Sequence, residues 1–306
     1  MRIVPYLDYL PTTYFELRHN KVEFYKRSKN MQFTGSIRKL VSKIVPNSRE
    51  VNYFLPIGDK LTPINQFIGS HLSIRLAGEI HCIQCGRKTN KSFAQGHCFP
   101  CMKSLASCDT CIARPELCHF HEGTCREPEW GESNCFTDHY VYLSNTSGLK
   151  IGITRGTQVP TRWVDQGAVA AMPIYRVSNR RVSGLLEKPA SSLVADKTNW
   201  RTMLKGNIPE INLATRFQEL EPQLEEIAAQ IRAEHGENSI LPANREMLNF
   251  VYPVIEYPSK VSSHNLDKAG EVQGKLMGIK GQYLILDTGV LNIRKYTGYT
   301  LEINAA

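Results

Sequence analysis

The clustering of cysteines constrains the fold of this chain more than any other feature. All nine cysteines of the 306 residues lie between Cys82 and Cys135. The first four form two Cys-x-x-Cys pairs, Cys82/Cys85 and Cys98/Cys101, and Gly86 suits the tight turn after the first pair. Each pair can point two sulfurs at one ion. The spacing predicts a structural zinc site with four thiolate ligands, with an iron–sulfur cluster or free thiols as the alternatives.

The remaining cysteines indicate a second metal site. Cys108-Asp-Thr-Cys111 supplies one half of such a site, and the spacing does not decide which later ligands complete it. We expect a second zinc ion, and an iron–sulfur cluster is the rival because thiolates also hold such clusters. The two histidines of this stretch are expected to be loop residues. The candidate ligands in this part of the chain are Cys108, Cys111, Cys118, Cys125 and Cys135; His119 and His121 lie between them in the sequence.

The rest of the chain sets the chemical setting of these thiols. No run of about 18 apolar residues is present, so we expect no membrane span. The first twenty residues carry charges and prolines instead of the apolar core of a signal peptide. We therefore expect a cytoplasmic protein, in which clustered cysteines bind metal and do not form disulfides.

Composition and charge bear on the partner. The chain is 42% hydrophobic and 22% charged, which predicts a packed core. Its formal net charge is +8 and its pI is about 9.0. A basic chain with zinc motifs favours a polyanion such as nucleic acid, DNA or RNA, whereas the other interpretation is a charge that serves solubility alone.

The residue patterns divide the chain into five regions. These are a β-rich region 1–80, a cysteine-rich zinc-binding module 81–137, an α/β region 138–206, a helical connector 207–248 and a β-rich module 249–306. Three- and four-residue apolar spacing predicts a helix over 212–236. Similar glycine-bounded strands in the first and last regions indicate two related modules, one sheet built from both chain ends, or chance. Residues 1–30 are left as an arm or a sheet edge.

Residues 139–155, HYVYLSNTSGLKIGITR, predict two strands joined by a polar turn. Gly152 lies inside the second strand, where a glycine often marks the close approach of another backbone or a ligand. A helix begins near Pro160, a third strand covers 172–177, and later helices carry Glu187 and follow Asn199.

The order of these motifs resembles the GIY-YIG nuclease superfamily over about a fifth of the chain. Tyr140-Val-Tyr142 stands at the first motif, Lys150-Ile-Gly152 at the second, and Arg162 and Glu187 follow in order. The whole chain also resembles an uncharacterised bacterial family of unknown function. The expected fold is α+β, with a small zinc-binding module followed by a GIY-YIG-like α/β domain with a short mixed sheet, flanked by N- and C-terminal β-rich modules.

The resemblance implies a metal-dependent endonuclease acting on DNA or structured RNA. Tyr142 is expected near the attacking water, Glu187 to hold Mg²⁺ or Mn²⁺, and Arg162 to stabilise charge on the phosphate. These residue types suit the chemistry, since a divalent metal acts as a Lewis acid and a guanidinium binds phosphoryl oxygens. Lys150 departs from the family pattern, and three roles are open for it. It donates to phosphate, acts as a base if burial lowers its pKa, or is a strand residue with an exposed ammonium group.

Six further residues are candidates for nucleic-acid contact: Tyr140, Arg155, Lys197, Asn199, Trp200 and Arg201. The simpler interpretation of two of them is that Asn199 caps a short helix and Trp200 fills the core. The alternative function is a non-catalytic zinc protein that binds RNA such as transfer RNA. A protein-interaction role, in which the zinc block is only a staple, is a third hypothesis.

Overall fold

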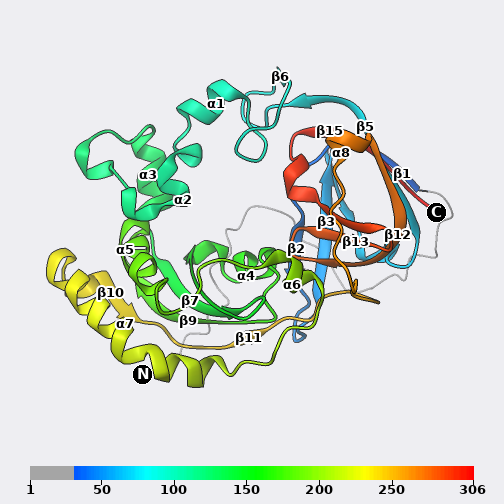
Figure 1. Cartoon of the computed structure of the whole chain (residues 1–306). Coiled ribbons are helices and arrows are strands. Elements are labelled where there is room, and N and C mark those ends of the chain that lie inside the picture. The colour runs from blue at the N-terminus through cyan, green and yellow to red at the C-terminus, as the bar shows by residue number, and fades with distance from the viewer. Residues whose placement is uncertain (1–30) are drawn as a thin grey trace.

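The structure is a computed structural model that describes residues 31–306 (Figure 1). Residues 1–30, for which the sequence leaves an arm or a sheet edge open, lie outside the described residues. Within residues 31–306 the chain combines helices with antiparallel sheets, and this confirms the α+β class. None of the helices in this part of the chain is both long and apolar enough to cross a membrane.

Both ends of the described chain contribute to one large sheet. Its strand order is β1-β15-β5-β12-β13-β14, with β6 paired to β5. Ile303 of β15 pairs with Phe33 of β1 on one side and Ile74 of β5 on the other. Of the three arrangements that the similar strands left open, one sheet built from both ends is the one observed. The strands are β1 Met31–Ser36, β5 His71–His81, β6 Lys88–Thr89, β12 Glu271–Lys280, β13 Tyr283–Leu286, β14 Gly289–Asn292 and β15 Tyr299–Ala305.

A smaller antiparallel sheet packs against this one. It has the order β2-β3-β4, from Val41–Ile44, Val51–Ile57 and Lys60–Pro63. Alternate residues of β3 and β15 are buried, as expected for strands with one face on a core. Their inward side chains share one apolar cluster. Short helical turns close the edges: η1 Asn65–Phe67, α8 Leu266–Ala269 and η7 Ile293–Tyr296.

The middle of the chain forms a five-stranded sheet, which is called the second sheet below. Its order is β10-β9-β7-β8, with β11 also on β9, and every pairing is antiparallel. The expectation of a mixed sheet is therefore wrong. Residues 156–169 carry the chain back along β7, so that β9 starts beside Asn145 and runs against β7. The strands are β7 His139–Asn145, β8 Leu149–Arg155, β9 Ala170–Val177, β10 Ile240–Pro242 and β11 Leu248–Asn249.

Helices cover the two faces of this sheet. Val141 and Leu143 of β7 pack with α5 Arg180–Ala190 and α7 Leu213–His235. Tyr142 points to the opposite face, where its ring lies 5.6 Å from that of Trp163 in α4 Thr161–Asp165. The helix predicted over 212–236 is confirmed as α7, which Asn212 caps and Gly236 ends. The other turns are η5 Gly156–Gln158, α6 Trp200–Leu204 and η6 Glu237–Ser239.

The cysteine-rich block runs from the end of β5 to the outer face of α5 (Figure 1). Its turn η3 packs on α5 at Gly184, where a Cβ atom would lie only 2.6 Å from the backbone nitrogen of Glu116. The block therefore bridges the large sheet and the second sheet. Its elements are α1 Phe99–Ser104, η2 Ala106–Cys108, α2 Thr110–Ala113, η3 Pro115–Leu117, η4 Phe120–Glu122 and α3 Pro128–Cys135.

One buried amide, that of Gln282, joins three parts of the chain. Its Oε1 accepts from the backbone N–H of Leu40 at 2.8 Å, and its Nε2 donates to the carbonyl oxygen of Leu40 at 3.0 Å. The same Nε2 donates to Asp165 Oδ1 of α4 at 2.9 Å. Lys39 forms an ion pair with the other oxygen of Asp165 at 2.6 Å. These contacts hold the second sheet against the large one.

The substitution Gln282→Ala is expected to lower the free energy of unfolding by about 2–4 kcal/mol, because it leaves a buried N–H and a buried C=O of Leu40 without partners. The measurement is urea unfolding followed by circular dichroism. Gln273→Ala, at an exposed glutamine of β12, is the control and should change stability by less than about 0.5 kcal/mol. Equal effects of the two substitutions would contradict this role of Gln282.

Candidate functional site

Four side chains proposed from the sequence come together from four different elements. Tyr142 lies on β7 and Lys150 on β8, and the two strands are paired with Tyr142 opposite Gly152. Arg162 comes from α4 and Glu187 from α5. The charges of Arg162 and Glu187 both act on Tyr142 and on Lys150. The structure therefore gathers the four residues in one group.

Gln166, which sequence reasoning missed, links Tyr142 to Arg162. Its amide lies 2.8 Å from Tyr142 Oη. With the amide nitrogen donating to this phenol, the amide oxygen accepts from Arg162 Nε at 3.2 Å and from Nη2 at 3.1 Å. This orientation satisfies all three groups and leaves the proton of Tyr142 to be donated elsewhere. The only sequence signal for Gln166 is its position four residues after Arg162 on one helix face.

Gly152 has a direct reason to be glycine. A Cβ atom at this position would lie 2.7 Å from Tyr142 Oη and 2.8 Å from its Cζ. The sequence predicted the close approach of another backbone or a ligand at Gly152, whereas the group that approaches is the phenol of Tyr142 across the strand pair. The Lys-Ile-Gly motif leaves room for Tyr142, which is completely buried.

Burial sets the proton state of the two strand residues. Burial raises the pKa of Tyr142 far above its usual range, and the charge of Arg162 opposes this. The phenol therefore stays protonated near neutral pH. Lys150 is only 5% exposed, and burial lowers its pKa to about 8, with the positive charge of Arg162 acting in the same direction. Its Nζ donates to the carbonyl oxygen of Asp196 at 3.0 Å.

Glu187 is the unusual carboxylate of this group. Burial raises its pKa to about 7, and the charge of Lys150 opposes the rise. Within the described residues the carboxylate of Glu187 has no hydrogen bond and no ion pair within 4.0 Å, whereas its backbone carbonyl accepts from Ser191 N at 2.9 Å. A largely buried carboxylate without a partner is costly unless it binds a cation. Its oxygens therefore remain available as ligands for a divalent ion.

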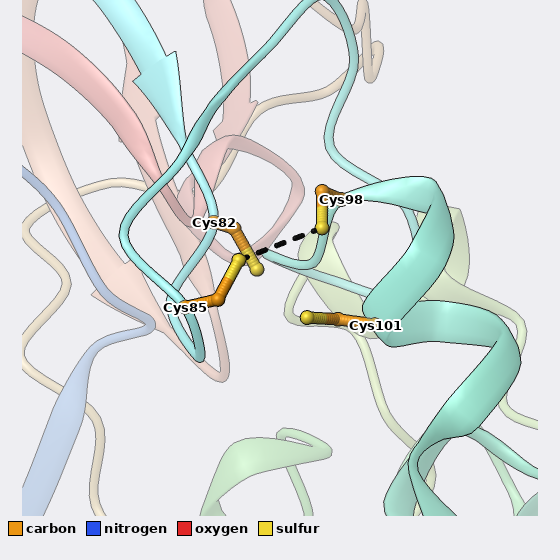
Figure 2. A group of neighbouring side chains, drawn as sticks. All are labelled: Cys82, Cys85, Cys98 and Cys101. Atoms are coloured by element: carbon orange, nitrogen blue, oxygen red, sulfur yellow. Dashed lines mark hydrogen bonds between the residues drawn. The ribbon is translucent and has the colours of Figure 1, made fainter.

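The four-cysteine cluster stands apart from this group, at the end of β5 (Figure 2). The sulfurs of Cys82, Cys85, Cys98 and Cys101 all lie within 4.8 Å of one another, and those of Cys85 and Cys98 are 3.7 Å apart. The first pair sits on a turn with Gly86 at φ +72°, whereas Cys98 and Cys101 flank the start of α1. Four thiolates at this spacing can hold a structural metal ion, and they suit tetrahedral zinc.

The backbone prepares one of these thiols for metal. Burial alone would raise the pKa of Cys82, but backbone N–H groups of Cys85, Cys98 and Gln84 lower it to about 6. Burial and the neighbouring thiols raise the pKa of Cys101 to about 12. Four sulfurs in one place cannot all ionise without a cation, so the cluster as built favours a bound metal.

The five later cysteines form no second four-thiol cluster within the described residues. Cys108 Sγ lies 3.5 Å from His97 Nδ1, and Cys111 lies instead with Asp109 and His119. All nine cysteines are unpaired. Cys118, Cys125 and Cys135 lie in the part of the block that follows η3, with Cys135 at the end of α3.

The residues proposed for nucleic-acid contact divide into two groups. Tyr140 and Arg155 lie at one end of the β7–β8 pair, and Arg155 Nη1 donates to Asn134 of α3. Asn199 caps α6 by accepting from Thr202 N at 3.2 Å, and the ring of Trp200 stacks on that of Tyr283. These contacts agree with the simpler interpretations, a helix cap for Asn199 and a packing role for Trp200. Lys197 and Arg201 are exposed beside them.

An open basic cleft lies beside α6, and sequence reasoning missed most of its lining residues. Its volume is about 390 Å³. Among the described residues that line it there are three cations and no carboxylate. Lys205 and Lys260 were not predicted from the sequence, because residues 55 positions apart give no local pattern. The lining residues are Asn199, Arg201, Thr202, Lys205, Ser259, Lys260 and Val261.

Comparison with known families places the chain in one of them. The family described as "Protein of unknown function (DUF2797)" matches residues 69–301, about three quarters of the chain, and the chain belongs to this family. No curated protein and no solved structure matches it. Because the description of the family names no activity, a function has to be argued from the site itself.

The substitution Cys98→Ser is expected to remove one zinc ion per chain and to lower thermal stability, because a serine hydroxyl does not replace a thiolate ligand. Zinc is measured by inductively coupled plasma mass spectrometry on the purified full chain. Cys108→Ser, at a cysteine outside the four-thiol cluster, is the matched control and should retain the wild-type zinc content. Unchanged zinc in Cys98→Ser would show that the cluster holds no ion.

Proposed function

We propose that the protein is a metal-dependent endonuclease that hydrolyses phosphodiester bonds in DNA or structured RNA. The observation that carries this proposal is the unpartnered, largely buried Glu187 beside Tyr142, Lys150 and Arg162. A carboxylate in that setting suits a divalent cation, and three neighbouring donors suit a phosphate. The motif order that resembles GIY-YIG nucleases supports the same activity.

Each side chain has a role that follows from its proton state. Arg162, oriented by Gln166, donates to phosphoryl oxygens on which negative charge develops. Tyr142 keeps its proton near neutral pH and donates a hydrogen bond to the nucleophile or to a phosphate oxygen. Lys150, with a pKa of about 8, has a neutral fraction at pH 7 and accepts the proton of the attacking water.

The cation in this proposal is Mg²⁺ or Mn²⁺ held by Glu187. Magnesium usually takes one or two carboxylates and keeps several waters, so a single glutamate is a sufficient protein ligand. When bound, it supplies Lewis-acid stabilisation of the phosphate. The zinc of the four-cysteine cluster is structural in this proposal, because four sulfurs leave no open position.

The basic cleft supports a polyanionic substrate. Arg201, Lys205 and Lys260 line it, no carboxylate is among its described lining residues, and the chain as a whole carries a net charge of +8. Thr202 and Ser259 add hydroxyl groups that can bind phosphate oxygens. The unpaired state of all nine cysteines further supports a cytoplasmic location.

A non-catalytic nucleic-acid-binding protein is the second candidate. The complete burial of Tyr142 and the hydrogen bond of Lys150 to a backbone carbonyl favour it, since both groups are already engaged in the protein. In that case the cleft beside α6 remains the contact surface and RNA such as transfer RNA remains a candidate ligand.

The substitution Glu187→Gln is expected to abolish cleavage of labelled RNA or plasmid DNA in magnesium, by at least about 100-fold, and also to stabilise the protein. Because the folded-state pKa of Glu187 is raised to about 7, its ionisation destabilises the folded state as pH rises from 4.5 through 7. The stability gain of the glutamine variant should therefore grow over that range, to at most about 3 kcal/mol at pH 8.

Two controls make this measurement decisive. Glu226→Gln, at an exposed position of α7, should leave both cleavage and stability unchanged. The metal-free reaction should omit magnesium and contain no EDTA, because EDTA also extracts structural zinc. No cleavage by the zinc-loaded wild type with any divalent metal would eliminate the nuclease proposal and leave the binding protein.

The double substitution Lys205→Ala/Lys260→Ala is expected to weaken nucleic-acid binding and to reduce the slope of log affinity against log salt by about 2, because two phosphate contacts are lost. Fluorescence anisotropy with labelled RNA and DNA at several salt concentrations measures this slope. Lys103→Ala/Lys188→Ala, at exposed lysines outside the cleft, is the charge-matched control. An identical loss in both variants would mean that only net charge matters.

A further inference from the structure

A second group of metal-ligand atoms lies in the cysteine block, separate from the four-thiol cluster. Ligand atoms of Asp109, Cys111 and His119 all lie within 4.8 Å of one another, and the three residues are half-buried. Asp109 caps α2, Cys111 lies within α2, and His119 precedes η4. Three types of ligand, a carboxylate, a thiol and an imidazole, thus meet at one place.

The hydrogen bonds of His119 determine which ring nitrogen faces this group. Nδ1 lies 2.7 Å from Thr124 Oγ1, and the same hydroxyl lies 3.2 Å from the carbonyl oxygen of His119. When the hydroxyl proton points to this carbonyl oxygen, Nδ1–H donates to the hydroxyl oxygen, and Nε2 of the neutral ring carries a lone pair. This tautomer makes both contacts, whereas the other one leaves the carbonyl without its hydrogen bond.

That lone pair faces a second acceptor. His119 Nε2 lies 3.4 Å from Asp109 Oδ2. In this tautomer two acceptors face each other, and a proton on the ring or a metal ion between them would relieve their repulsion. The thiol of Cys111 adds a third potential negative charge at the same place. One guanidinium, that of Arg126, lies 2.7 Å from Asp109 Oδ2 and offsets part of this charge.

We propose that Cys111 Sγ, His119 Nε2 and a carboxylate oxygen of Asp109 bind a second zinc ion. Mixed sulfur, nitrogen and oxygen donors suit zinc, and three protein ligands leave one position for water. Thr124 acts as the outer partner that fixes the tautomer of the ligating histidine. The proposal replaces Cys108, which the sequence paired with Cys111, by His119. It does not depend on the nuclease proposal.

The location gives such an ion a structural consequence. Residues 111 and 119 enclose η3, the turn that packs on α5 at Gly184. Within the enclosed segment, the carbonyl oxygen of Ile112 accepts from Arg180 Nη2 of α5. An ion joining Cys111 to His119 therefore closes the loop that holds the cysteine block against the helix carrying Glu187.

The test compares two histidines of the same loop. Zinc per chain is measured by inductively coupled plasma mass spectrometry for the full-length wild type, His119→Ala and the matched control His121→Ala. His121 contacts Arg181 and Glu122, not the proposed ligands. We expect two zinc ions in the wild type and in His121→Ala, and one in His119→Ala. A single ion in the wild type, or two in His119→Ala, would overturn the proposal, as would iron with acid-labile sulfide.

A milder variant covers the case in which His119→Ala does not fold. Thr124→Val keeps the size of the side chain and removes the hydrogen bond to Nδ1. It should weaken binding of one zinc ion by about 10- to 100-fold and leave the other unchanged. Titration of the purified chain with a zinc chelator of known affinity measures both ions. Equal affinities in Thr124→Val and wild type would overturn the proposal that Thr124 orients a zinc-ligating His119.

Discussion

The pairing of β5 with both β15 and β12 is the interaction on which the rest of the molecule depends. β5 ends at His81, and β12, which lies beside it in the sheet, begins at Glu271. Everything between them, the cysteine block and the second sheet, is therefore a single excursion that leaves and returns at neighbouring strands. Backbone hydrogen bonds fix both ends of this excursion, and Gln282 ties its middle to the same sheet through Asp165.

The cysteine block has too little buried apolar surface to form a core of its own. Between residues 82 and 137, all of which are described, the buried apolar side chains are Cys82, Cys98, Ala106, Pro115 and Cys135. So little apolar burial does not offset the conformational entropy of ordering more than fifty residues. Docking on α5 offsets part of this cost, and a metal ion held by the four-cysteine cluster would offset more of it. The block can then connect the large sheet rigidly to the second sheet (Figure 1).

The candidate site contains buried ionisable groups whose unfavourable desolvation a purely structural group would avoid. Burial raises the pKa of Glu187 to about 7 and lowers that of Lys150 to about 8, so the pKa values of both groups lie near neutral pH. A structural ion pair of these residues would instead keep both charged and in contact. Groups with perturbed proton states and without mutual pairing are typical of functional sites, and the surrounding cores stabilise them. The apolar clusters on both faces of the second sheet provide this support.

What the sequence by itself determined is local. The Cys-x-x-Cys spacing predicted the four-sulfur cluster, apolar periodicity predicted α7, and the β7–β8 hairpin followed from alternation around a polar turn. Each of these features depends on residues that lie close together in the sequence. Only the tertiary structure decided the rest: β1 beside β15, β9 antiparallel to β7, Gln166 between Tyr142 and Arg162, and His119 beside Cys111. These arrangements depend on burial summed over the whole chain and on loop closure, for which no short stretch of sequence carries a pattern.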